Sequence, residues 1–129
     1  MTKICKILIV EDQREIQELL HELLSNEGYR FLIVGDGAAM RSALDTHSDI
    51  DIVVIDVLLP GGTDGLGLAQ EVCDRGLPVI LVTGDHQQSG RLDASGHAYL
   101  LKPFRIDAFL KAIETALEHA KRNCERLRA

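Results

Sequence analysis

Several side chains that could carry phosphoryl chemistry lie directly after short apolar segments of this sequence. There are four such segments, and the polar residues that follow them in turn are Glu11 with Asp12, then Asp56, then Thr83 and then Lys102. If the segments are parallel strands of one sheet, the groups meet at its carboxyl edge, where open α/β sheets bind their ligands. This edge would then hold three carboxylates, one hydroxyl and one ammonium group. Such a set of groups is suited to a magnesium-dependent site that accepts a phosphoryl group.

The adjacent acids Glu11 and Asp12 repel each other unless a cation lies nearby. Magnesium meets this need, because it binds one or two carboxylates together with water and phosphate oxygens. A structural role is the alternative, since Asp12 is placed to cap the helix that follows, with Glu15 at the capping-box position. The pair alone therefore leaves both roles open.

Asp56 follows an apolar, β-branched run, where a carboxylate without a partner would be costly. In a doubly wound sheet of strand order 2-1-3-4-5, the ligand crevice lies between strands one and three. This order places Asp56 opposite Glu11 and Asp12. A carboxylate beside a bound metal can attack a phosphoryl group and form an aspartyl phosphate. Taken alone, Asp56 is also compatible with a capping or turn role.

Lys102 and Thr83 supply the remaining groups. Lys102 ends an apolar segment, and Pro103 restricts the backbone around it. Its ammonium group would neutralise charge on the transferred oxygens. Thr83 offers a hydroxyl donor, and Gly84 leaves room for a phosphoryl group. A solvated lysine and a Thr-Gly turn are the ordinary alternatives, so the prediction depends on the joint occurrence of these groups at four strand ends.

Apolar, strand-like segments alternate with segments of helical period throughout the sequence. This alternation predicts an α/β fold, namely a doubly wound five-stranded parallel sheet with five flanking helices. The expected strands are residues 4–10, 29–34, 51–55, 79–82 and 98–101. The expected helices are one that ends before residue 28, then 37–46, one that ends near 75, 85–95, and one from 106 into the charged segment 118–129. The helix at 85–95 is almost without apolar residues and is expected to be short, irregular or mobile.

The composition fits a single domain over residues 1–129. Apolar residues make up 46% of the chain, which is enough for a core, and a net charge of −6 argues against a nucleic-acid-binding surface. No apolar segment approaches the roughly 20 residues that span a bilayer, and the N-terminus lacks a signal-peptide pattern. We therefore expect a cytoplasmic protein that contacts neither nucleic acid nor membrane. Cys5 and Cys73 are expected to be buried and Cys124 exposed.

The sequence resembles the receiver domain of two-component response regulators, the CheY-like family with a flavodoxin-like fold. The resemblance extends over essentially all 129 residues and rests on the order and spacing of its motifs. These motifs are Val10-Glu11-Asp12, Val54-Ile55-Asp56, Leu59-Pro60-Gly61 with Asp64-Gly65, Val82-Thr83-Gly84, and Tyr99-Leu100-Leu101-Lys102-Pro103-Phe104. The resemblance implies a bacterial signalling protein that takes a phosphoryl group from a histidine kinase or a histidine phosphotransfer protein.

The resemblance also implies individual roles for the site residues. Asp56 would be the phosphoacceptor, with Thr83 and Lys102 holding the phosphoryl oxygens. Mg²⁺ would be the cofactor. Its implied ligands are Glu11, Asp12, Asp56 and the backbone carbonyl of Leu58. The bond between Lys102 and Pro103 would be cis.

A conformational switch is the expected output of phosphorylation. The modification adds roughly −1.5 to −2 charges, and Thr83 could move inward to bond the new oxygens. Tyr99 would then rotate toward the core and bias the face formed by 85–95, 98–101 and the helix from 106. The same face is a candidate dimer interface, and the output partner is unknown.

Two departures from the family pattern stand out. The loop after Asp56 carries one more residue than the commonest family spacing, with Gly61-Gly62 before Thr63, and the helix at 85–95 is unusually polar. The extra residue lies beyond Leu58 and should spare the metal site. The polar helix is part of the expected output face, so we do not expect this face to behave as is typical of the family.

Three alternative functions fit the sequence less well than this interpretation. An aspartate-nucleophile phosphatase of the haloacid dehalogenase type would need a second acid two residues after Asp56, where this sequence has Leu58. A flavin- or nucleotide-binding module would need a GxGxxG motif or P-loop after the first strand. A receiver that serves only as an interaction scaffold would not need its acids, Thr83 and Lys102. We therefore expect a phosphoacceptor signalling domain rather than a conventional enzyme, either stand-alone or part of a longer regulator or hybrid kinase.

Overall fold

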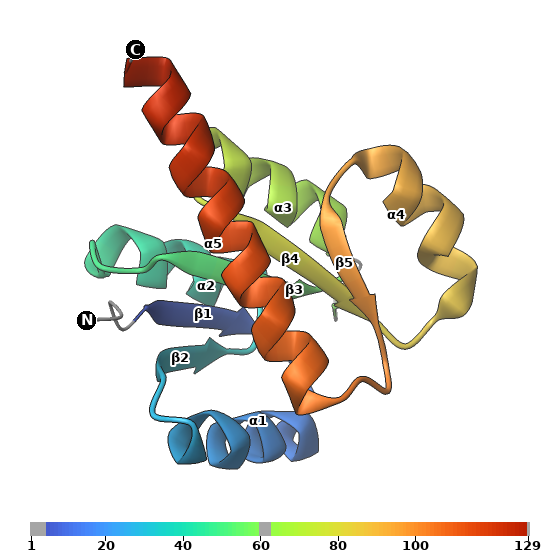
Figure 1. The fold of residues 1–129 in the computed structure, drawn as a ribbon. Coiled ribbons are helices and arrows are strands. Elements are labelled where there is room, and N and C mark those ends of the chain that lie inside the picture. Colours follow the sequence, from blue (N-terminus) through green and yellow to red (C-terminus); the bar gives the residue numbers. More distant parts are fainter. Residues whose placement is uncertain (1–4, 60–62, 129) are drawn as a thin grey trace.

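The computed structural model describes residues 5–59 and 63–128, and it describes side chains over 5–59 and 63–119. Its framework is a five-stranded sheet in the order β2-β1-β3-β4-β5 (Figure 1). All four strand pairings are parallel. The predicted α/β fold and strand order are therefore confirmed.

The elements alternate along the chain as βα units. The strands are β1 (Lys6–Val10), β2 (Arg30–Val34), β3 (Ile52–Asp56), β4 (Val79–Thr83) and β5 (Ala98–Leu101). The helices are α1 (Arg14–Asn26), α2 (Gly37–Thr46), α3 (Gly65–Asp74), the 3₁₀ helix η2 (His86–Gln88), α4 (Ser89–Ser95) and α5 (Ile106–Arg128). Most boundaries lie within one or two residues of those expected from the sequence.

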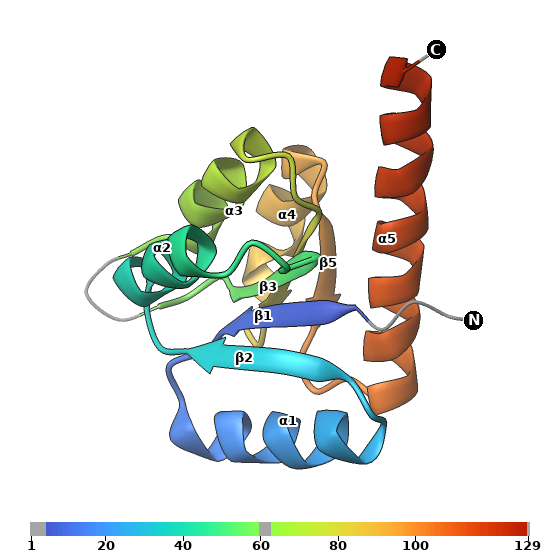
Figure 2. The same ribbon diagram turned by 90° about the vertical axis from the view of Figure 1, so that its left-hand side faces the viewer.

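Two apolar layers hold the sheet, one on each face. Successive side chains of a strand point to opposite faces, so Leu8 of β1 packs toward α2, α3 and α4, whereas Ile7 and Ile9 pack toward α1 and α5. Figure 2 shows these two groups of helices on opposite sides of the sheet. Because β3 and β4 lie in the middle and are buried on both faces, their sequences are continuous apolar runs rather than alternating ones.

The ends of α1 differ in part from the sequence prediction. Its N-cap residue is Gln13, with no side-chain capping hydrogen bond, so the expected capping role of Asp12 was wrong. At the other end, Gly28 adopts a positive φ of 77°, which L-residues disfavour, and its N–H donates to Ser25 O at 3.1 Å. Asp12 therefore lies in the loop after β1 and does not cap α1.

The segment between β4 and β5 is short and irregular, as the sequence predicted. It consists of η2 and the seven-residue α4, whose single buried apolar side chain is Leu92. The long α5 extends past the end of the sheet toward the C-terminus (Figures 1 and 2). In the part of the chain that is described, no helix combines the length and apolar character needed to cross a membrane.

The cysteine prediction was correct for one of its three residues and wrong for another. Cys5 is buried, but Cys73 near the end of α3 is exposed rather than buried. Its thiol lies 3.9 Å from Nδ1 of His97. The Cys124 side chain lies outside the described side chains.

Candidate functional site

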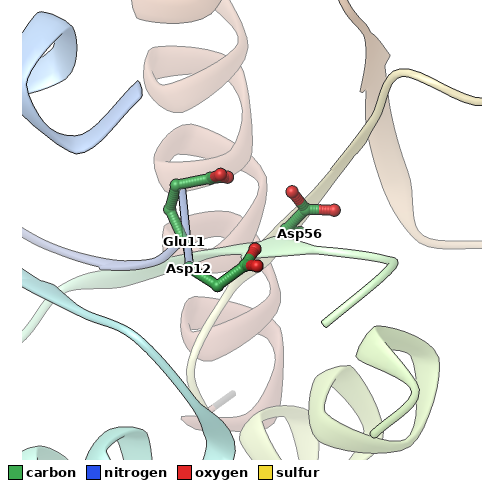
Figure 3. Close-up of side chains that lie close together, drawn as sticks. All are labelled: Glu11, Asp12 and Asp56. Atoms are coloured by element: carbon green, nitrogen blue, oxygen red, sulfur yellow. The ribbon is translucent and has the colours of Figure 1, made fainter. Parts of the chain in front are cut away.

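The three candidate acids come together at the carboxyl edge of the sheet. Val10 pairs with Ile55 across β1 and β3, so the residues that follow these two lie side by side. Ligand oxygens of Glu11, Asp12 and Asp56 all lie within 4.8 Å of one another. Figure 3 shows the three carboxylates converging from the ends of the two strands.

Lys102 brings a positive charge to this cluster from the end of β5. Its Nζ lies 3.0 Å from Asp56 Oδ2 and 3.1 Å from Glu11 Oε2. These partners are 46 and 91 residues away in sequence. The side chain of Lys102 is 20% exposed and that of Glu11 is 2% exposed. The predicted proximity of the acids and the amine is therefore confirmed.

Backbone contacts fix the acids within the edge. The N–H of Glu11 donates to Val34 O at 2.9 Å, which extends the β1–β2 pairing by one residue. Glu11 Oε1 accepts from the N–H of Gln13 at 3.2 Å. Asp56 Oδ1 accepts from the N–H of Leu58 at 3.0 Å. Because Asp56 Oδ2 faces Lys102, its two oxygens have different environments.

Burial and the neighbouring charges change the pKa of Glu11 and of Lys102. Burial raises the pKa of Glu11 to about 7, and the nearby Asp56 carboxylate adds to the rise while Lys102 opposes it. Burial alone would lower the pKa of Lys102, but its contacts with Asp56 and Glu11 leave that pKa raised. Lys102 is therefore charged at neutral pH, and it does not fully compensate the acids around it.

The raised pKa of Glu11 predicts a pH-dependent stability of the metal-free protein. The folded state holds a proton on Glu11 that the unfolded chain, with an ordinary pKa of 4.5, releases first. The Glu11 contribution should therefore weaken as pH rises from about 4.5 through about 7. Thermal unfolding in EDTA at pH 5.5 and 8 should show that Glu11→Gln gains stability over the wild type as pH increases. Parallel pH profiles of the two proteins would contradict the prediction.

Thr83 and Lys102 are tied together at the ends of β4 and β5. The N–H of Lys102 donates to Thr83 O at 2.7 Å. Thr83 is fully buried, and its Oγ1 accepts from the N–H of Asp85 at 3.1 Å. Nε2 of His86 lies 3.3 Å from the Lys102 carbonyl and is the donor in that contact. Among the described residues outside the adjacent chain, the nearest atom to a Cβ added at Gly84 is Lys102 Cβ, at 3.9 Å, so residue 84 is not closely packed on that side.

The other residues named from the sequence also lie around this edge. The Lys102–Pro103 peptide bond is cis. Leu58, directly beyond the acids, is 53% exposed. Tyr99 on β5 is half-buried, and its hydroxyl donates to Asp93 of α4. The additional residue of the β3–α3 loop falls among 60–62, outside the described residues, so its effect stays a prediction.

Gly65 is required by the close approach of α3 to the end of β3. A Cβ on residue 65 would lie 2.4 Å from Asp56 O and 2.6 Å from Val57 Cα, both backbone atoms that cannot move aside cheaply. The Gly65 N–H donates to Val57 O at 2.9 Å. This contact explains why glycine follows Asp64, the residue that caps α3.

Gly65→Ala should therefore destabilise the fold by about 3 kcal/mol and displace the Asp56 backbone. Gly67→Ala is the matched control, because no atom from another part of the described chain lies within 4 Å of its added Cβ and it is inside the same helix. That control should stabilise by about 0.5–1 kcal/mol. Urea unfolding of both variants checks the pair, and equal effects would refute the steric argument.

Sequence reasoning missed several residues that support the site. Gln17 of α1 binds the backbone carbonyl of Glu11. Arg91 of α4 forms an ion pair with Asp64, and Asp93 accepts from Tyr99. Arg91 and Asp93 flank Leu92 in the sequence and have the pattern of ordinary solvated helix residues, because their partners come from other elements. No local sequence signal marks such long-range contacts.

A doubly wound parallel sheet with clustered acids and a lysine at its carboxyl edge is the arrangement typical of a receiver-type domain. A sequence model of the response regulator receiver domain matches residues 7–114 of this chain. The chain therefore belongs to the response regulator receiver domain family. Receiver domains of this family act in bacterial two-component systems as phosphoacceptors, and they generally bind Mg²⁺ at an acidic pocket.

Two curated relatives place this chain in the context of longer proteins. The transcriptional regulatory protein YbdJ of Bacillus subtilis is 36% identical over 118 residues, which cover 88% of this chain and 51% of YbdJ. The regulatory protein VanR of Enterococcus faecium is 31% identical over 121 residues, which cover 91% of this chain and 52% of VanR. The chain thus spans about half the length of these relatives.

A solved structure shows the same similarity in three dimensions. The response regulator protein TrrA of Thermotoga maritima, determined in complex with Mg(2+)-BeF, superposes with a TM-score of 0.77 at 27% sequence identity. The match covers 88% of this chain and 100% of TrrA.

Proposed function

We propose that Asp56 accepts a phosphoryl group from the phosphohistidine of a histidine kinase or a histidine phosphotransfer protein, with Mg²⁺ as cofactor. The observation that supports this best is the cluster of three carboxylates with Lys102 between two of them. An isolated surface acid needs neither the second and third carboxylate nor the half-buried cation.

The donor set of the site fits Mg²⁺. Its ligand atoms are carboxylate oxygens, which this hard cation prefers, and they lie close enough to bind one ion. Burial of Glu11 beside Asp56 also leaves negative charge that Lys102 only partly compensates. We assign the ion to Glu11, Asp12, Asp56 and the Leu58 carbonyl. When bound, Mg²⁺ would neutralise charge on the transferring phosphoryl oxygens.

The transfer itself exchanges one bond to phosphorus for another. A carboxylate oxygen of Asp56 forms the new P–O bond as the P–N bond to the donor histidine breaks. The imidazole leaves with the electron pair and takes up a proton. Lys102, already within 3.0 Å of Asp56 Oδ2, stays charged and supports the oxygens that gain negative charge. Later hydrolysis returns the Asp56 carboxylate and inorganic phosphate.

A small phosphodonor tests this function without the unknown kinase. Incubation with acetyl phosphate should transfer one phosphoryl group per chain in Mg²⁺, with acetate as the leaving group, and none in excess EDTA. Phosphotransfer profiling against the histidine kinases of the source organism would then identify the partner. Absence of labelling in Mg²⁺ from both kinds of donor would favour a receiver used as an interaction scaffold.

The output of phosphorylation, in this proposal, is a change at the face formed by α4, β5 and α5. Tyr99 holds α4 through Asp93 in the unphosphorylated protein, and this hydrogen bond raises the pKa of the Tyr99 hydroxyl. Movement of Thr83 toward the phosphoryl oxygens would open space for the Tyr99 ring and break its contact with Asp93. The face is then free to bind an output partner or a second copy.

Breaking of the Tyr99–Asp93 contact should be visible by NMR. In the wild type, phosphorylation should shift the Tyr99 ring resonances and the Asp93 carboxylate resonance together. Thr83→Ala should be labelled at Asp56 but should show little of this shift, because it lacks the hydroxyl that couples the phosphoryl group to Tyr99. Tyr29, on the other face of the sheet, is an internal control. An equal Tyr99 shift in Thr83→Ala would contradict the coupling.

The proposed activity is that of a signalling domain rather than a conventional enzyme. A phosphatase of the haloacid dehalogenase type would need an acid two residues beyond the nucleophile, and Leu58 occupies that position. We expect residues 1–129 to form one receiver domain. The downstream process depends on partners that act through its output face.

A further inference from the structure

A glutamine of α1 holds the main chain between the first two acids. Nε2 of Gln17 donates to the backbone carbonyl of Glu11 at 2.5 Å. The backbone of Gln17 is itself fixed in the first turn of α1, since its N–H donates to Gln13 O at 3.0 Å. The half-buried side chain thus links a helix to the loop that carries Glu11 and Asp12.

This contact completes the fixation of Glu11. Its N–H is already bound to Val34 O, and Gln17 holds its carbonyl, so both peptide planes that flank the residue have a set orientation. The carbonyl belongs to the peptide unit that joins Glu11 to Asp12. The direction of the Asp12 Cα–Cβ bond therefore depends on the hydrogen bond from Gln17.

Asp12 depends on the backbone more than the other two acids do. Within the described part of the chain, Glu11 and Asp56 each contact Lys102 and accept a backbone N–H, whereas the Asp12 carboxylate has no hydrogen bond to the protein. Asp12 is also exposed. Its position in the acid cluster is therefore set by the backbone conformation at residue 12.

We propose that Gln17 is a positioning residue for the Glu11–Asp12 pair, which it keeps in the arrangement that binds Mg²⁺. This inference rests on the proposed function, because it concerns the same metal site. Without the amide donor, the Glu11–Asp12 peptide can rotate, and Asp12 leaves the cluster for part of the time. Metal binding weakens, while transfer to Asp56 is unchanged once the ion is bound.

Gln17→Met tests the proposal, because methionine matches the length of glutamine but cannot donate. The Mg²⁺ concentration that half-saturates labelling by acetyl phosphate should rise roughly tenfold, in line with losses of residues that support metal ligands. The labelling rate at saturating Mg²⁺ should stay at the wild-type value, and the melting temperature in EDTA should fall only slightly, because one hydrogen bond is lost. Isothermal titration with Mg²⁺ alone should show the same weakening.

Gln70→Met is the matched control. Gln70 is also a helical glutamine whose amide donates a hydrogen bond, at 3.0 Å to Asp74, but it lies on α3. Its Mg²⁺ dependence should equal that of the wild type. If Gln17→Met proves unstable, Gln17→Asn replaces it, since that amide is one methylene too short to reach the carbonyl. The ¹⁵N shift of the Asp12 amide reports loss of the bond to the preceding carbonyl.

The outcomes separate this inference from the proposed function. A wild type that is neither labelled nor able to bind Mg²⁺ overturns the function itself. A normal wild type together with an unshifted Mg²⁺ midpoint in the Gln17 variant overturns the positioning role. A fall in the rate at saturating Mg²⁺ with an unshifted midpoint does so as well. A raised midpoint with an unchanged saturating rate supports it.

Discussion

Replacement of Asp56 by asparagine will abolish labelling by acetyl phosphate or by a phosphorylated kinase. The carboxamide keeps the shape of the side chain, and its oxygen can still accept the N–H of Leu58, but it is no longer a carboxylate nucleophile. The fold should persist in EDTA, because loss of one acid reduces repulsion in the cluster while Lys102 keeps its contact with Glu11.

Asp45→Asn is the control for this experiment. Asp45 also pairs with a cation, Arg75 at 2.9 Å, but on the surface between α2 and α3. The Asp45→Asn protein should be labelled by acetyl phosphate to the same extent as the wild type. Magnesium-dependent labelling that persists in Asp56→Asn would show that another residue accepts the phosphoryl group.

Lys102→Met will lower stability and slow labelling, but it will strengthen Mg²⁺ binding. Loss of the amine removes the internal partner of two largely buried acids, which should destabilise the metal-free fold by about 3 kcal/mol at pH 8. Labelling by acetyl phosphate should fall by roughly two to three orders of magnitude, since the charge beside the transferring oxygens is gone. Mg²⁺ should nevertheless bind more tightly, because no competing cation remains among the acids.

Chemical unfolding in EDTA, labelling kinetics and Mg²⁺ titration measure these three effects separately. Lys111→Met is the control, because Lys111 is an exposed lysine of α5. A Lys102→Met protein that is as stable as the wild type and is labelled at the same rate would contradict the assigned role of the amine.

The strand order and the acid cluster could be predicted because both follow from patterns that are strong in the sequence. The β3 and β4 runs are apolar at every position before the site, which is typical of strands covered on both faces. Once such strands are parallel and in the observed order, the residues that end them must share an edge. This topology places Lys102 and Glu11, 91 residues apart in sequence, at the same edge, where the long lysine side chain reaches the carboxylate.

The supporting contacts could not be predicted in the same way, because they depend on how helices sit on the sheet. Gln17 resembles any polar residue of an amphipathic helix until the position of α1 against β1 is known. Arg91 and Asp93 looked like solvent-facing residues of a weak helix, yet they reach Asp64 and Tyr99 in other elements. Such side-chain pairs require the packing angles and not only the hydrophobic pattern.

The error at the start of α1 has a similar cause. A helix N-cap and a metal ligand are both served by an acid directly after a strand, and the sequence cannot separate them. In the structure the helix begins one residue later than a cap at Asp12 requires, with Gln13 as its N-cap. Asp12 therefore remains available to the acid cluster at the edge of the sheet.

The central claim is that Glu11, Asp12, Asp56 and Lys102 form one magnesium-dependent phosphoacceptor site. Its most direct test is a crystal structure of this chain with Mg²⁺ and beryllofluoride, which mimics a phosphoryl group on a carboxylate. We predict one metal ion among the three acids, beryllofluoride bonded to Asp56, and its fluorines in contact with Lys102 and Thr83. Beryllofluoride on a different carboxylate, or a metal ion bound away from this edge, would contradict the account.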